Sequence, residues 1–79
     1  MNDWQERIIN ERAELHVRLI GLLEFLGSKE VDTLIIAEQQ RLRAQAAAMI
    51  QYSDALTGRI DAVFEKLTDV INENYQPAH

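Results

Sequence analysis

The sequence predicts an all-α fold: an antiparallel helical hairpin with a long second helix, assembling into a homo-oligomeric helical bundle. Three observations support this prediction. Apolar residues recur at helical spacing in two long segments, no proline occurs before Pro77, and a short polar stretch beginning after Gly27 separates the segments. With 79 residues, the chain is expected to form a single domain over residues 1–79.

The first helix is predicted over about residues 3–26. Asp3 is followed three residues later by Glu6, a pairing typical of a helix start. Gly27 is the type of residue that commonly ends a helix in a left-handed conformation. Gly21 lies inside the helix and weakens it by up to about 1 kcal/mol relative to Ala. The apolar stripe of this helix consists of Trp4, Ile8, Leu15, Leu19, Leu22 and Leu26.

The second helix is predicted over about residues 34–74. Residues 28–33 connect the two helices, with Thr33 expected to cap the second helix and Val31 expected to be buried. Gly58 offers a point where the second helix bends or folds back, and the tail 75–79 is expected to fray. An apolar residue stands at every seventh position of this segment: Ile35, Leu42, Met49, Leu56, Val63 and Val70.

The two helices differ in length, and this predicts self-association. In a tight hairpin the numbers of facing residues add up to about 60, so that the first helix ends near Leu56. Leaving large apolar side chains exposed beyond that point costs about 1.5–3 kcal/mol each. We therefore expect these side chains to dock on another protomer, unless the helix folds back at Gly58. The six residues concerned are Ile60, Val63, Phe64, Leu67, Val70 and Ile71.

Composition argues against several classes of function. The chain has no cysteine and only two histidines, His16 and His79, so no metal or cofactor site is predicted. A net charge of −5 disfavours binding to nucleic acid polymers. No signal-peptide pattern or membrane-length apolar run occurs, so we expect a cytoplasmic protein without a membrane partner. Ser28 and Ser53 have no histidine near them in sequence, and no enzyme is predicted.

The pattern of residues 1–60 resembles a family of short phage proteins known as relatives of an uncharacterised crAss-like phage protein. One part of the pattern is Trp4-Gln5-x-Arg7-x-x-x-Glu11-x-x-Glu14-Leu15. The other is Arg41-Leu42-x-x-Gln45-x-x-Ala48-Met49-x-x-Tyr52-x-x-x-Leu56-x-x-Arg59-Ile60. The chain departs from the family pattern at Ile35-Ile36, where Pro-Glu is common, and at His16, where an acid is common. Its second helix is also longer than usual, which bears on the geometry of the oligomer.

The resemblance implies a phage origin, and therefore a location in the host cell cytoplasm. The architecture is similar to helical-hairpin phage sponge proteins that counter CBASS and Thoeris immunity by sequestering nucleotide second messengers. Those proteins are homo-oligomers with ligand pockets between protomers. By this analogy, which concerns the fold alone, we expect the partners to be a second copy of the chain and a cyclic nucleotide or cyclic ADP-ribose-type signal.

A polar stripe on the second helix offers candidate ligand-binding residues. Gln45, Tyr52 and Arg59 lie seven apart beside the apolar stripe. Tyr can stack on a base, Arg can bind a phosphate through two hydrogen bonds, and Gln can read a base edge. Arg12 interrupts the stripe of the first helix and is the fourth candidate. The alternative is structural: Tyr52 packs on Ile8, and Arg59 pairs with an acid of the first helix such as Asp3.

The leading hypothesis is thus a phage counter-defence sponge that binds an immune nucleotide signal at protomer interfaces. One alternative is an acidic helical module that inhibits or adapts a host protein. Another is a phage accessory protein with no small ligand. The acidic module would use a ladder of carboxylates four residues apart, which otherwise forms a solvated face. The ladder consists of Asp61, Glu65, Asp69 and Glu73.

Overall fold

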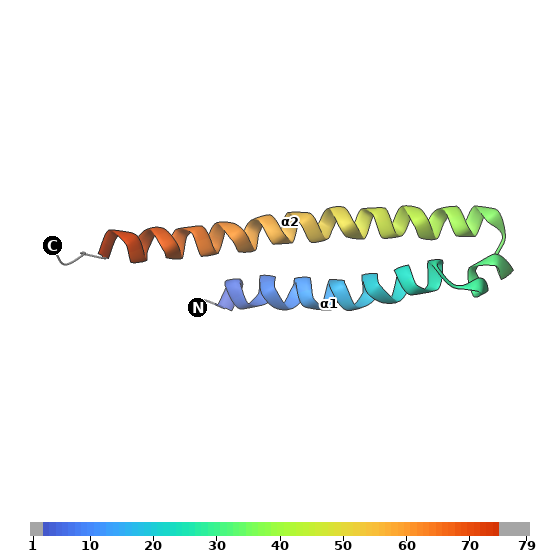
Figure 1. The fold of residues 1–79 in the computed structure, drawn as a ribbon, viewed down its shortest axis with the longest axis horizontal. Coiled ribbons are helices and arrows are strands. Elements are labelled where there is room, and N and C mark those ends of the chain that lie inside the picture. The colour runs from blue at the N-terminus through green and yellow to red at the C-terminus, as the bar shows by residue number, and fades with distance from the viewer. Residues whose placement is uncertain (1–2, 75–79) are drawn as a thin grey trace.

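Two antiparallel α-helices make up the molecule (Figure 1). The computed structural model describes residues 3–74, with side chains described as far as residue 66. Helix α1 runs Asp3–Leu26, a short 3₁₀ helix η1 runs Lys29–Thr33, and helix α2 runs Ile36–Asn74. Both helices and the hairpin are as predicted, while the fraying expected for residues 75–79 lies outside the described residues. No described helix is long and apolar enough to span a membrane.

The start of α2 differs from the prediction. Thr33 does not cap this helix, because its Oγ1 donates a hydrogen bond back to the Glu30 carbonyl at 2.6 Å, within its own turn. Ile35 precedes α2 instead, and its carbonyl oxygen accepts bonds from the backbone N–H groups of Glu38 and Gln39. The Gln39 side chain donates to the Leu34 carbonyl at 2.9 Å, which links the start of α2 to the connection.

The end of α1 is also built differently from the expected glycine cap. Gly27 follows the last helical residue, but no described glycine has a positive φ, so the left-handed conformation is not used. The Ser28 hydroxyl donates instead to the Phe25 carbonyl at 2.6 Å, satisfying an acceptor that the end of the helix leaves open. Val31 is buried at 4% exposure, as predicted, and η1 contacts α1.

The core lies along the seam between α1 and α2. Ile8 and Leu15 of α1 form one cluster with Leu56 and Ile60 of α2, and Leu56 is the most buried side chain at 1% exposure. Each of these helices thus buries one apolar stripe against the other, which is why the helical periodicity predicted these four positions correctly. Trp4 and Ile35, the outermost members of the predicted stripes, are 51% and 71% exposed instead. Ile9 and Met49 pack against the cluster from its edges.

The alignment of the two helices differs from the predicted one by about two helical turns. Three side-chain hydrogen bonds between described residues cross the seam: from Arg12 to Thr57, between His16 and Ser53, and from Tyr52 to Glu11. The residue numbers of the first two pairs add up to 69, and those of Tyr52 and Glu11 to 63, instead of about 60. The reason is the connection: η1 and the extended residue Leu34 hold the helix ends apart, where a tight turn would bring Leu26 opposite Leu34.

This alignment corrects the prediction that α2 outruns α1 from Ile60 onwards, which we call the overhang. Ile60 was expected to lack an intrachain partner, but it is buried in the core at 4% exposure. Val63 is half-buried and Phe64 is half exposed, and both line a shallow apolar groove with Gln5 and Ile9. The side chains of Leu67, Val70 and Ile71 lie outside the described ones. Helix α2 runs without interruption through Gly58 and extends past the first turn of α1 (Figure 1), so the chain does not fold back there.

Candidate functional site

The seam divides the hairpin into two faces that differ in chemistry. Successive helical residues are rotated by about 100°, so residues flanking the apolar stripe fall on opposite sides of it. On one side lie Glu11 and Tyr52, and on the other Arg12 and Thr57. We call the side with Glu11, Glu14, Arg18, Gln45, Tyr52 and Arg59 the tyrosine face. We call the side with Ile9, Arg12, His16, Ile20, Leu23, Ile50 and Thr57 the histidine face.

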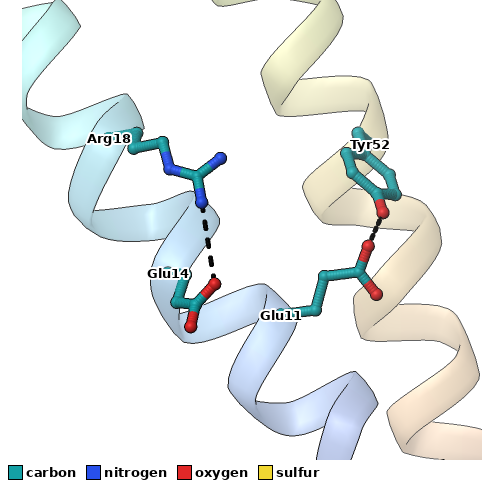
Figure 2. Close-up of polar contacts among 4 residues, drawn as sticks. All are labelled: Glu11, Glu14, Arg18 and Tyr52. Atoms are coloured by element: carbon teal, nitrogen blue, oxygen red, sulfur yellow. Dashed lines mark hydrogen bonds and ion pairs between the residues drawn. The ribbon is translucent and has the colours of Figure 1, made fainter.

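Most polar groups of the tyrosine face are bonded to one another or to a neighbouring side chain. The Tyr52 hydroxyl donates a hydrogen bond across the seam to the Glu11 carboxylate, and Arg18 pairs with Glu14 at 3.6 Å on α1 (Figure 2). The Gln45 amide contacts the Met49 sulfur at 4.0 Å, one turn further along α2. Both members of the Arg18–Glu14 pair are 70% exposed, so this pair is well solvated.

Three of the four predicted ligand residues lie on this face, but not within reach of one small ligand. Gln45 and Arg59 are fourteen residues apart on one helix, which separates them by about 21 Å along its axis. Tyr52 stands between them and is held by Glu11. Arg59 is exposed and forms no hydrogen bond or ion pair with the described side chains, so the alternative pairing with Asp3 is not formed.

Arg12, the fourth candidate, lies on the histidine face, away from the other three. Its Nη1 donates to the Thr57 hydroxyl at 3.2 Å, and the side chain is partly buried. The structure therefore keeps the predicted set of four residues apart within one protomer. Binding of a ligand by these residues stays a prediction, and a site that uses all four needs more than one copy of the chain.

His16 and Ser53 form a contact that the sequence analysis missed. The His16 Nε2 and the Ser53 Oγ are 2.6 Å apart and hydrogen-bonded, and Ser53 is buried at 8% exposure. Together with Arg12 and Thr57 they form two hydrogen-bonded pairs across the seam, and we call these four residues the polar ladder. The spacing in the sequence could have indicated this pairing. Arg12 and His16 lie four apart on one helix, and Ser53 and Thr57 lie four apart on the other, so each pair shares one face of its helix.

A serine beside a histidine is also the arrangement of a nucleophile and its base. Such a pair usually needs a third group that orients the imidazole. Among the described residues, no carboxylate is hydrogen-bonded to His16. The contact has a structural explanation. It gives the buried Ser53 hydroxyl a hydrogen-bond partner, and leaving that hydroxyl without one would cost about 1–3 kcal/mol.

Exposed apolar side chains border the polar ladder on the histidine face. Ile20 is 56% exposed on α1, and Ile50 is 43% exposed on α2. Leu23 lies one turn beyond Ile20, and Val17 stands at the outer edge of the same helix. The histidine face thus combines two partly buried basic side chains with a surrounding apolar surface, the mixture that is typical of small-ligand sites and protein interfaces.

Comparison with known proteins identifies the family. The family model described as Sequestin matches residues 2–62, which include α1, the connection and most of the described part of α2. No curated protein and no solved structure matches the chain. The name fits the predicted likeness to sponge-type phage proteins, while the closer resemblance to the crAss-like phage protein family stays a prediction. The match covers more than half of the chain and every residue of both faces, so the chain belongs to the Sequestin family.

Proposed function

We propose, from its membership in the Sequestin family, that this protein is a homo-oligomeric sponge for a host immune nucleotide second messenger. The signal binds at interfaces between protomers and is withheld from its host receptor, which is a phage counter-defence function. The observation that carries the proposal is the histidine face, where Arg12 and His16 are partly buried within an apolar surround. The family name supports binding rather than catalysis.

Self-association is supported by the apolar surface that one hairpin leaves uncovered. A chain of this size buries only about 60% of the surface that it exposes when unfolded. Ile20 is 56% and Ile50 43% exposed, so covering the rest of each would contribute about half of the ~1.5–3 kcal/mol of full burial. A second copy of the chain is the partner always present with it. Among the described residues, the following hydrophobic side chains are buried: Ile8, Leu15, Leu19, Val31, Ala46, Leu56 and Ile60.

The class of ligand follows from the chemistry of the proposed interfaces between protomers. Arg side chains bind phosphate through two parallel hydrogen bonds, and apolar or aromatic side chains accept the flat surface of a base. A net charge of −5 disfavours long nucleic acids, whose binding depends on many basic contacts. A small cyclic nucleotide or a cyclic ADP-ribose-type signal needs only one or two such contacts.

The proposal is tested with the full chain in two steps. Native mass spectrometry of protein purified from cells gives the oligomer mass and detects any retained small molecule. Thermal-shift titration then covers cyclic dinucleotides, cyclic trinucleotides and cyclic ADP-ribose isomers. We expect one class to raise the melting temperature, by an amount equivalent to about 2.7 kcal/mol at a hundred times its Kd.

Release of the ligand separates a sponge from an enzyme. After heat denaturation of the complex, a sponge returns the signal intact, whereas hydrolysis at the Ser53–His16 pair would return a product of different mass. A monomeric mass together with no thermal shift from any compound would contradict the proposal. If the protein is instead an acidic interaction module, reversing the exposed charges Asp61 and Glu65 abolishes function while Arg12→Gln does not.

A further inference from the structure

We infer that Arg12 and His16, held in place by the hydroxyls of Thr57 and Ser53, form the subsite that binds a phosphate group of the ligand. This inference rests on the proposed function and names the part of the surface that recognises the anion. It moves the phosphate contact from the predicted stripe of Tyr52 and Arg59 to the opposite face of the hairpin.

The first argument is that both basic groups bond only to neutral partners. Arg12 donates from Nη1 to the Thr57 hydroxyl, and His16 bonds to the Ser53 hydroxyl. Neither forms an ion pair with a described carboxylate. A guanidinium has five N–H donors, so one bond to Thr57 leaves donors for a phosphate. The Arg12 side chain is partly buried, where a contact between its charge and a phosphate is stronger than in open water.

The second argument is that the arginines of the tyrosine face and of the start of α2, unlike Arg12, lie near carboxylates. Arg18 pairs with Glu14, and Arg41 pairs with Glu38 at 2.9 Å. Arg59 is unpaired among the described side chains, but it is exposed on the face that carries the Glu11 carboxylate. A phosphate approaching Tyr52 would meet that same carboxylate, and repulsion between like charges opposes binding there.

The third argument is that no acid of α1 stands beside Arg12 or His16, because Glu6 and Glu24, the acids of α1 nearest to this face, lie about 80° further round the helix than His16. Helix α2 contributes Asp54 and Asp61 near this face, but they lie about 60° and 40° further round the helix than Thr57. Their side chains are exposed and lie on the outer edge, away from α1. The residues that α1 contributes are Ile9, Arg12, His16, Ile20 and Leu23.

The test uses inorganic pyrophosphate as the probe, so that it does not depend on the identity of the nucleotide. The full ¹⁵N-labelled chain is titrated with pyrophosphate and followed by NMR. We expect saturable shifts centred on Arg12, His16, Ser53 and Thr57. Arg12→Gln, which keeps a donor for Thr57, should weaken binding at least tenfold, and His16→Gln should weaken it by a smaller factor.

Arg18→Gln is the matched control, because it removes the same charge from the other face and should change the affinity less than twofold. Circular dichroism confirms that each variant folds, and Arg12→Lys provides a second variant that keeps the charge but loses the forked geometry. The inference is overturned by shifts centred on Tyr52 and Arg59, by unchanged affinity in Arg12→Gln, or by the absence of saturable shifts.

The two proposals fail in distinguishable ways. If a nucleotide raises the melting temperature but pyrophosphate does not bind at Arg12, the sponge function stands and the phosphate subsite does not. If pyrophosphate binds at Arg12 but no nucleotide in the panel binds, the subsite stands and the proposed signal class is wrong.

Discussion

The two faces of the hairpin use similar residue types for opposite purposes. On the tyrosine face, Tyr52 and Arg18 are each bonded to a carboxylate, and the surface is polar and solvated (Figure 2). On the histidine face, Arg12 and His16 bond only to hydroxyls and are bordered by exposed isoleucines. The comparison shows that the neighbours of a charged residue decide whether its surface is suited to bind an anion. The charge of an arginine beside a glutamate is already balanced by the carboxylate.

The largest expected effect comes from breaking the seam that creates both faces. Leu56→Ala removes the most buried side chain of the core and should lower the free energy of unfolding by about 2–5 kcal/mol. Urea denaturation followed by circular dichroism measures the loss. Ile36→Ala, at a site that is 71% exposed, should change it by less than about 0.5 kcal/mol. Equal midpoints for both variants would show that the two helices do not pack along this seam.

The next effect tests which face meets a second copy. Ile20→Glu combined with Ile50→Glu places charges on the histidine face and should raise the dissociation constant of the oligomer at least a hundredfold, about 2.7 kcal/mol. Sedimentation equilibrium gives the constant. Ala48→Glu with Ala55→Glu adds the same charge to exposed positions on the tyrosine side of α2 and should leave the mass unchanged. If only the alanine variants dissociate, the assignment of the faces is reversed.

A smaller effect separates the polar ladder from the core. Ser53→Ala removes the hydrogen bond to His16 and should cost about 1 kcal/mol of unfolding free energy. Because both variants break the same bond, adding His16→Gln to Ser53→Ala should cost less than the two single losses together. Urea titrations of the four proteins give this coupling energy. Strictly additive losses would mean that the bond does not contribute to stability.

The smallest effect is expected on the tyrosine face. Tyr52→Phe removes the hydroxyl that donates to Glu11, and Arg18→Ala removes an exposed ion pair. Each should change stability by less than about 0.5–1 kcal/mol, because solvent replaces both contacts at these exposed positions. Thermal unfolding monitored by circular dichroism is sufficient to show the change. A larger loss than for Ser53→Ala would place the more important polar contacts on this face.

The sequence predicted the elements well and their alignment poorly. Helical periodicity depends on local geometry, so the bounds of α1 and the buried positions Ile8, Leu15 and Leu56 were correct. The alignment depends on the shape of the connection. There Thr33 bonds backward and η1 adds length, and neither feature has a simple residue signature. Hence Ile60 was wrongly assigned to the overhang.

The candidate site was harder to predict because it joins residues about forty positions apart. The His16–Ser53 contact exists only in the observed alignment, and a hairpin shifted by two turns would place other residues opposite His16. Arg12 was identified because it interrupts an apolar stripe, which is a local signal. Its partner Thr57 was not identified, because a threonine on a helix carries no such signal.

The spacing of the polar ladder also specifies how the two helices are aligned. Sliding α1 by one turn in one direction would place Arg12 opposite Ser53 and His16 opposite Met49, leaving the imidazole against a thioether. Sliding it the other way would place the buried Ser53 hydroxyl opposite Ile20, at a cost of about 1–3 kcal/mol. The apolar stripes alone tolerate such slips, because they repeat every turn or two. The four polar residues therefore select one alignment among several of similar hydrophobic burial, before any ligand is bound.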